Sequence, residues 1–91
     1  MLNHVILVGK IAEIGDDYVK ISVPRNYKNE NGEYDKDIIK CEVMKTLMNN
    51  IEEYCKNNDT VGVKGRIENV DNVNVIIVEK LTFLSSKKNE E

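Results

Sequence analysis

The sequence has few of the residues that mark disordered chains or metal-binding proteins. Its 91 residues include one proline and five glycines, and 41% are hydrophobic, which favours a folded chain. Cys41 and Cys55 stand too far apart for a CxxC pair, and His4 is the single histidine. We therefore expect no zinc site, no redox pair and no cofactor, and interpret both cysteines as small core residues.

No segment has the features of a leader or of a membrane anchor. The N-terminus lacks a charged start followed by a long apolar run and a small-residue cleavage site, and no run of about eighteen apolar residues follows. These absences predict a cytoplasmic protein with reduced thiols. The formal charge of −3 gives no basic excess, so a positive patch must come from uneven placement of the charges.

The length limits the core. A chain of 91 residues buries only about 60–65% of its unfolded surface, so we expect one domain with a thin core that gains from self-association. The domain is expected over residues 1–84. The final segment, SSKKNEE, has nothing apolar to bury, which predicts a frayed tail over residues 85–91.

Branched residues that alternate with polar ones predict five strands. Turn signals separate them, among them GDD (15–17) and NG (31–32). In the fourth strand Val61 and Ile67 share the inward face and Lys64 lies on the other. We expect strands over residues 2–14, 18–23, 39–44, 60–67 and 73–84.

One helix is expected between the third and fourth strands. In TLMNNIEEYCKNND (46–59), with Thr46 as the cap, the apolar residues recur at helical spacing. Its inward face is expected to hold Leu47, Ile51, Tyr54 and Cys55. This element order is that of the oligonucleotide-binding barrel, although another small α+β domain can share it. The predicted fold class is mainly all-β.

Thirteen residues without one aliphatic side chain, 25–37, lie between the second and third strands. A solvated hairpin is one interpretation of this polar arm. The other is a binding site for single-stranded nucleic acid, because such a site needs rings on which bases stack and cations that meet phosphates. The arm offers both in Arg25, Tyr27, Lys28, Tyr34 and Lys36.

Three segments resemble, in the same order, the bacterial single-stranded DNA-binding protein family. They are MLNHVILVGKI, VPRNYKNENGEYDKDIIKCEV and NNIEEYCKNNDTVGVKGRI. The resemblance implies a five-stranded oligonucleotide-binding barrel that protects single-stranded DNA, without sequence specificity, in replication, recombination or repair. No enzymatic activity is expected, and the residues offer no nucleophile beside a base in a known pattern.

The resemblance also implies that the arm is a finger that follows the nucleic-acid backbone, with Tyr27 as the aromatic residue at its base. The family has two further aromatics where this chain has Ile38 and Met44. These two residues can contact bases, Met44 through its thioether, or belong to an apolar face. Strand cations are often only solvated, and those expected to join the site are Lys10, Lys40, Lys64 and Arg66.

Self-association is expected through the first strand. Its segment HVILV would leave a hydrophobic edge if uncovered, which predicts a homodimer or homotetramer. Family members continue in a long linker and an acidic tip that recruits other proteins, whereas this sequence stops at SSKKNEE. The resemblance leaves open a shortened DNA-binding core or a small natural paralogue.

A second function fits the missing aromatic residues and the net negative charge. The chain would then be an adaptor barrel for a helicase or another primosome protein, in a conjugative or phage replication complex, with weak DNA binding. The short connection around Val70, where the family often has a second finger, also predicts a shallow groove.

Overall fold

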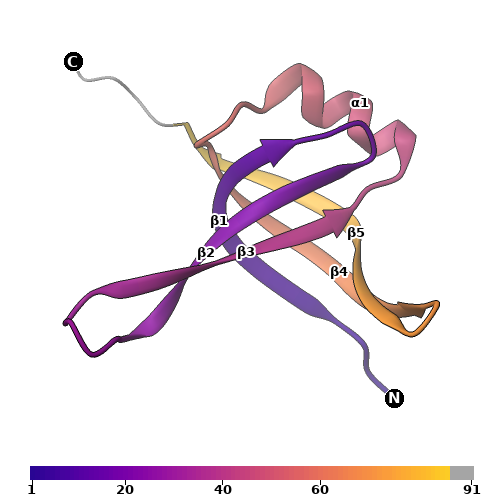
Figure 1. Cartoon of the computed structure of the whole chain (residues 1–91). Helices are drawn as coiled ribbons and strands as arrows, with labels where there is room; N and C mark the ends of the chain where they lie inside the picture. Colours follow the sequence, from indigo (N-terminus) through magenta and orange to yellow (C-terminus); the bar gives the residue numbers. More distant parts are fainter. Residues whose placement is uncertain (87–91) are drawn as a thin grey trace.

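In residues 1–86, which the computed structural model describes, five strands close into a barrel in the order β1-β2-β3-β5-β4 and one helix packs against it (Figure 1). The elements are β1 (Val5–Ile14), β2 (Tyr18–Lys28), β3 (Tyr34–Glu42), α1 (Lys45–Tyr54), β4 (Thr60–Val70) and β5 (Val73–Ser85). The expected barrel, with its helix between the third and fourth strands, is confirmed.

β1 changes its neighbour at Lys10, which pairs with Ser22 of β2 and with Thr60 of β4. Before this point residues 5–9 pair with β4, and the pairing of β1 with β2 starts only at Lys10. The barrel closes through a short parallel contact of β3 with β5, which joins Cys41 to Ile76 and Glu42 to Ile77. All other strand pairs are antiparallel.

The inward positions of the strands form the core, and α1 covers it from one side. The buried apolar residues are Ile11, Val19, Ile21, Cys41, Val43, Met48, Ile51, Cys55, Val61, Val63 and Val78. Both cysteines are buried and free, as core residues should be. Burial raises the pKa of Cys41 to about 11, so its thiol stays protonated at neutral pH.

The buried face of α1 is rotated from the expected one. Met48, which the spacing did not select, is 2% exposed, as is Ile51. Tyr54 lines a depression together with Phe83 of β5, as expected of a residue between helix and barrel, but at 70% exposed it is not part of the core.

Both ends of α1 also differ from the expectation. Met44 is the N-cap and no side chain caps it, so Thr46 is not the cap. The helix ends at Tyr54 because the carboxylate of Asp59 accepts a hydrogen bond from the N–H of Lys56 at 2.9 Å and holds the next residues in a turn.

Ile67, expected on the buried face of the fourth strand, is 44% exposed. The reason is the late start of β1, which begins at Val5 and pairs no further along β4 than Gly65. Beyond this point the side chain of Asn3 takes the place of a strand. Its Nδ2 donates to the carbonyl of Ile67 at 2.8 Å, and its Oδ1 accepts from the N–H of Ile67 at 2.9 Å.

The polar arm is mostly strand. β2 and β3 continue beyond the barrel as an antiparallel ribbon, and residues 29–33 form its tip (Figure 1). The β4–β5 hairpin ends in a two-residue turn, Asp71 and Asn72, with φ of 52° and 68°. Asparagine and aspartate tolerate this left-handed backbone, and the expected short connection is confirmed.

β5 ends at Ser85, and residues 87–91 lie outside the described residues. The expectation of a frayed tail over residues 85–91 therefore falls mostly there and stays a prediction. Within residues 1–86, no helix is long and apolar enough to cross a membrane.

Gly65→Ala is expected to destabilise the barrel, because a Cβ there would lie 2.2 Å from the backbone oxygen of Ile77. A backbone atom cannot rotate out of the way as the end of a side chain can, so the free energy of unfolding should fall by about 1–3 kcal/mol. Gly62→Ala is the matched control in the same strand, since its Cβ would have Leu84 as nearest neighbour at 3.8 Å. Chemical denaturation compares the two. Equal stability of both variants would contradict the close approach of β5 to β4.

Candidate nucleic-acid interface

Residues 25–37 form the finger, whose tip is organised by one side chain. The Oδ1 of Asn29 accepts hydrogen bonds from the N–H groups of Asn31 (2.8 Å) and Glu33 (3.0 Å), and its Nδ2 donates to Asp35 at 3.0 Å. Gly32 adopts a φ of 80°, which a residue with a Cβ rarely does. The finger is thus a folded hairpin with its own hydrogen bonds.

The alternation of β3 brings four predicted residues to one side. Alternate positions of a strand share a side, and Tyr34, Lys36, Ile38 and Lys40 are all exposed, opposite in side to the half-buried Ile39 and the buried Cys41. Their cross-strand partners on β2 are Lys28, Pro24, Ser22 and Lys20. We call this surface the outer face of the ribbon. It continues from the finger onto the barrel wall, because the same strands form both.

Two tyrosine rings project from the finger beside cations. Tyr27 is 59% exposed and Tyr34 is 55% exposed. The Cζ of Arg25 lies 6.0 Å from the ring centroid of Tyr27, and the Nζ of Lys28 lies 5.9 Å from that of Tyr34. These distances are at the outer limit of a cation–π contact. Each ring is therefore presented to solvent together with a positive group.

Arg25 is held by carboxylates. Its Nη2 and Nε donate to Asp37 at 2.9 and 3.2 Å, and its Nη1 lies 3.9 Å from Asp35. The guanidinium keeps the pKa of Asp37 below its ordinary value. Because Asp35 and Asp37 alternate with Lys36 on β3, they belong to the opposite side of the ribbon. The structure thus separates Arg25 from the lysines of the outer face.

Lys10 and Lys36 share a depression of about 340 Å³ on the barrel wall. It lies where β1 changes its neighbour, and its other lining residues are Val8, Gly9, Ser22, Pro24 and Thr60. Two cations, two hydroxyl groups and no carboxylate line it. The structure therefore brings Lys10, predicted from the first strand, to the edge of the outer face.

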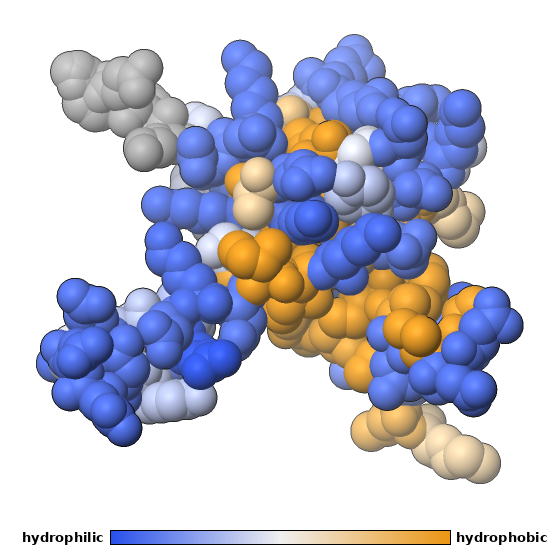
Figure 2. All heavy atoms as spheres, viewed as in Figure 1, coloured by the Kyte–Doolittle hydropathy of each residue, from blue (hydrophilic) through white to orange (hydrophobic). Residues whose placement is uncertain are grey.

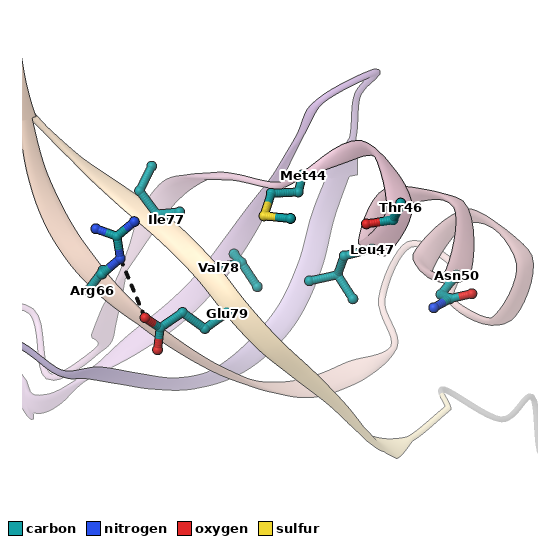
Figure 3. Close-up of a pocket in the computed structure, with 8 residues that line it drawn as sticks. All are labelled: Met44, Thr46, Leu47, Asn50, Arg66, Ile77, Val78 and Glu79. Carbon is teal, nitrogen blue, oxygen red and sulfur yellow. Dashed lines mark ion pairs between the residues drawn. The ribbon is translucent and has the colours of Figure 1, made fainter.

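Met44 and Arg66 line a groove of about 450 Å³ between α1 and β5 (Figure 3). Met44 is 64% exposed. The Nη1 of Arg66 pairs with Glu68, and its Nε lies 3.4 Å from Glu79. The other lining residues are Thr46, Leu47, Asn50, Ile77 and Val78.

Lys64 stands apart from the other predicted residues. It is exposed on β4 and lies opposite Ile6 of β1 and Lys80 of β5, neither of which belongs to the ribbon. Two lysines directly opposite each other repel unless an anion lies between them. The structure therefore leaves Lys64 and Lys80 as a separate positive spot on the barrel.

Tyr18 is an aromatic residue of the outer face that the sequence analysis did not select. Its ring centroid lies 4.7 Å from the Nζ of Lys40 and 5.9 Å from that of Lys20. Its hydroxyl donates to Glu13 at 2.5 Å, and this bond raises the pKa of Tyr18 and lowers that of Glu13. Tyr18 and Lys20 stand two positions apart on one strand, so their side chains share a face. This spacing is the signal by which the sequence could have identified Tyr18. The bond to Glu13 ties the first hairpin together.

Apolar surface extends between the finger and the β4–β5 hairpin, as Figure 2 shows. The exposed apolar side chains of β3, β4 and β5 include Ile38, Ile67, Val70 and Val73. Such a surface can cover the faces of unstacked bases, since a base is apolar on its face and polar at its edge. At position 38, where the family has an aromatic residue, this surface carries the aliphatic side chain of Ile38.

The model of the single-strand binding protein family matches residues 2–81. Single-stranded DNA-binding protein B of Bacillus subtilis (strain 168) is 32% identical over 110 aligned residues, which cover 100% of this chain and 97% of that protein. The single-stranded DNA-binding protein of Staphylococcus epidermidis is 28% identical, with 100% and 83% covered. The chain is thus similar to curated relatives along its whole length.

Solved structures share the fold. The mitochondrial single-stranded DNA binding protein of S. cerevisiae has a TM-score of 0.71 at 17% identity, covering 98% of this chain and 100% of that one. The small single-stranded DNA-binding protein of Streptomyces coelicolor has a TM-score of 0.63 at 14% identity, covering 91% and 94%. At these identities the likeness shows the fold alone.

Asn29→Ala is expected to loosen the tip and leave the barrel folded, because two backbone N–H groups lose their acceptor. A hydrogen bond contributes about 0.5–1.5 kcal/mol, so amide exchange of Asn31 and Glu33 should become about two- to twelvefold faster. Asn31→Ala is the matched control, since that residue supplies its backbone N–H to the tip. Exchange measured by NMR that is unchanged in Asn29→Ala would contradict this role.

Proposed function

Since this chain belongs to the single-strand binding protein family, we propose that it binds single-stranded DNA without sequence specificity along the finger and the outer face of the ribbon. The observation that carries this proposal is that both sides of the finger expose a ring: Tyr34, with Lys28 of the outer face 5.9 Å from its centroid, and Tyr27, with Arg25 at 6.0 Å on the other side. Every base has a face that can stack, so Tyr27 and Tyr34 would accept any sequence.

The phosphates would be met mainly by lysines. Lys28, Lys36 and Lys40 follow the outer face, and Lys10 joins it across the depression on the barrel wall. None of the ion pairs within residues 1–86 involves these four. Same-face positions on a strand recur about every 6.8 Å, which gives a row of cations for an extended backbone.

Binding by one barrel would be weak. Ile38 and Met44 are 56% and 64% exposed, so they can contact bases, but neither provides a ring. Two missing stacks, at about 1–3 kcal/mol each, would lower the affinity by about thirtyfold to ten-thousandfold. A chain with such sites gains most when several barrels hold the same strand.

The protein would act where single strands are exposed, in replication, recombination or repair, and therefore in the cytoplasm. Family membership makes it a binding protein and not an enzyme. A helicase or another primosome protein is a second partner to test. The absence of rings at Ile38 and Met44 is the observation that favours this adaptor role.

Self-association through β1 completes the proposal. Residues 5–9 pair with β4 on one side, and their other edge carries no strand in residues 1–86. Ile6 and Val8 are 73% and 54% exposed on this segment. A second copy that pairs its own β1 here would cover the edge and both side chains.

Tyr27→Ala is expected to weaken binding by about 1–3 kcal/mol, because one base loses its stacking ring. The slope of affinity against salt should stay the same, since no phosphate contact is removed. Fluorescence anisotropy with labelled oligo-dT at several salt concentrations measures both. Tyr54→Ala, which removes a tyrosine that is 70% exposed on α1, is the control. An absence of binding by the unmodified protein at low salt and micromolar concentration would refute the function itself.

Ile6→Lys is expected to convert the proposed dimer or tetramer into a monomer, because it places a charge on the uncovered edge. Light scattering at micromolar concentration measures the assembly. Val73→Lys is the control, since it changes an apolar residue that is 59% exposed on β5, a strand that is not a neighbour of β1 in the barrel. A monomer already in the unmodified protein would overturn the assembly and leave DNA binding untouched.

A further inference from the structure

We infer that Lys20 and Lys40, gathered at the ring of Tyr18, hold one phosphate group of the bound strand. We call these three residues, together with Glu13, the phosphate seat. The inference rests on the proposed function and adds to it a positioning residue, since Tyr18 acts on the cations and does not contact the DNA itself.

The two lysines of the seat stand directly opposite each other. Lys20 on β2 and Lys40 on β3 are register partners, so their side chains share the outer face of the ribbon. Like charges in this arrangement destabilise a strand pair unless neighbouring groups compensate them. Two such groups are present. The Oε1 of Glu13 lies 3.6 Å from the Nζ of Lys20, and the ring centroid of Tyr18 lies 4.7 Å from the Nζ of Lys40.

This compensation leaves one positive charge at the seat. Glu13 neutralises one of the two ammonium groups, whereas the ring attracts Lys40 through its quadrupole and carries no charge. None of the ion pairs within residues 1–86 involves Lys40. Its ammonium group therefore keeps donors for a further acceptor. A phosphodiester group carries one negative charge and offers oxygen acceptors, so it matches the seat.

The ring of Tyr18 is fixed by the first hairpin. Its hydroxyl donates to the Oε2 of Glu13 at 2.5 Å. The ring also lies against Gly15, where a Cβ would overlap three of its carbon atoms, and the N–H of Gly15 donates to the carbonyl of Tyr18 at 2.9 Å. A fixed ring keeps the ammonium of Lys40 in place before DNA arrives. Such preorganisation reduces the ordering cost of binding.

The ring of Tyr18 suits a cation better than a base. Tyr18 is half-buried, whereas the finger rings of Tyr27 and Tyr34 are 59% and 55% exposed. Gly15 covers part of the ring, and the Nζ of Lys40 lies over it. A stacked base would have to displace this lysine. Binding of a phosphate to the lysine requires no such displacement.

The phosphate seat lies where the cations of the outer face end. The next register pair beyond it is Tyr18 with Glu42, and the turn between β1 and β2 carries Asp16 and Asp17. Carboxylates at these positions repel a phosphate backbone. A strand that follows the lysines from the finger would therefore be held at the seat before it leaves the ribbon.

Tyr18→Leu tests the seat, because leucine fills space without an aromatic quadrupole. We expect its affinity for oligo-dT to fall about two- to fivefold, which corresponds to an exposed cation–π contact. The salt slope should become shallower by up to about 0.7, since one phosphate contact loosens. Tyr18→Phe is the matched control, which keeps the ring and should bind like the unmodified protein. Fluorescence anisotropy at several salt concentrations measures both quantities, and chemical denaturation measures the stability of each variant.

A double-mutant cycle assigns the effect of the ring to its cation. Lys40→Met removes the ammonium group, and in this background we expect Tyr18→Leu to lower the affinity little further. Lys64→Met is the control, because Lys64 is exposed on β4 outside the ribbon. Its effect and that of Tyr18→Leu should add.

Glu13→Gln gives an expected gain, which a folding defect cannot imitate. Glutamine keeps an acceptor for the hydroxyl of Tyr18 and removes the charge that pairs with Lys20. We expect tighter binding with a salt slope steeper by up to about 0.7, because a second ammonium group becomes available to phosphate. Binding that is unchanged or weaker in Glu13→Gln would count against the seat.

Three further results would overturn the inference. If Tyr18→Leu binds more weakly with an unchanged salt slope, the ring stacks on a base. If Tyr18→Leu binds like the unmodified protein, the ring only stabilises the hairpin. If Tyr18→Phe loses as much affinity as Tyr18→Leu, the hydroxyl and not the ring is required. All three leave the proposed function intact. Failure of the unmodified protein to bind any single-stranded oligomer at low salt would refute that function instead.

Discussion

The antiparallel pairing of β2 with β3 is the interaction on which the interface depends. Its register runs from Tyr18 opposite Glu42 to Lys28 opposite Tyr34, so one ribbon forms part of the barrel wall and the whole finger. Buried residues such as Ile21 and Cys41 fix the register at the barrel end. A slip of one residue would turn the lysines inward and the core residues outward. The core therefore positions cations that lie well beyond it.

The charges are divided between two kinds of cation. Both arginines, Arg25 and Arg66, are paired with two carboxylates each, whereas among the lysines of the outer face only Lys20, which lies 3.6 Å from Glu13, takes part in an ion pair within residues 1–86. The finger itself has three cations and four carboxylates, so its net charge does not attract DNA. Attraction of DNA must therefore come from the side of the ribbon on which the lysine side chains are grouped. This explains how a chain of charge −3 can still present a positive path.

The sequence was sufficient for the barrel and for the ring-bearing finger, because period-two alternation and turn residues are local signals. It was insufficient to predict that both arginines are held in ion pairs. Asp37 reaches Arg25 from the neighbouring strand, and Glu79 reaches Arg66 in the same way, so both contacts depend on register. Met48 was missed because a short helix with few apolar residues does not define its inward face to within one position.

Weak sites on each barrel are consistent with a protein that coats a strand. Because Ile38 and Met44 are exposed without carrying a ring, the proposed function gives a single barrel few stacking contacts, and we expect it to release bases quickly. Joining barrels through β1 makes the second contact intramolecular, and the effective concentration can then raise the overall affinity by orders of magnitude without any new contact. The uncovered edge of β1 would in this way compensate for the missing rings at Ile38 and Met44. The less each barrel binds alone, the more the function depends on the assembly that this edge permits.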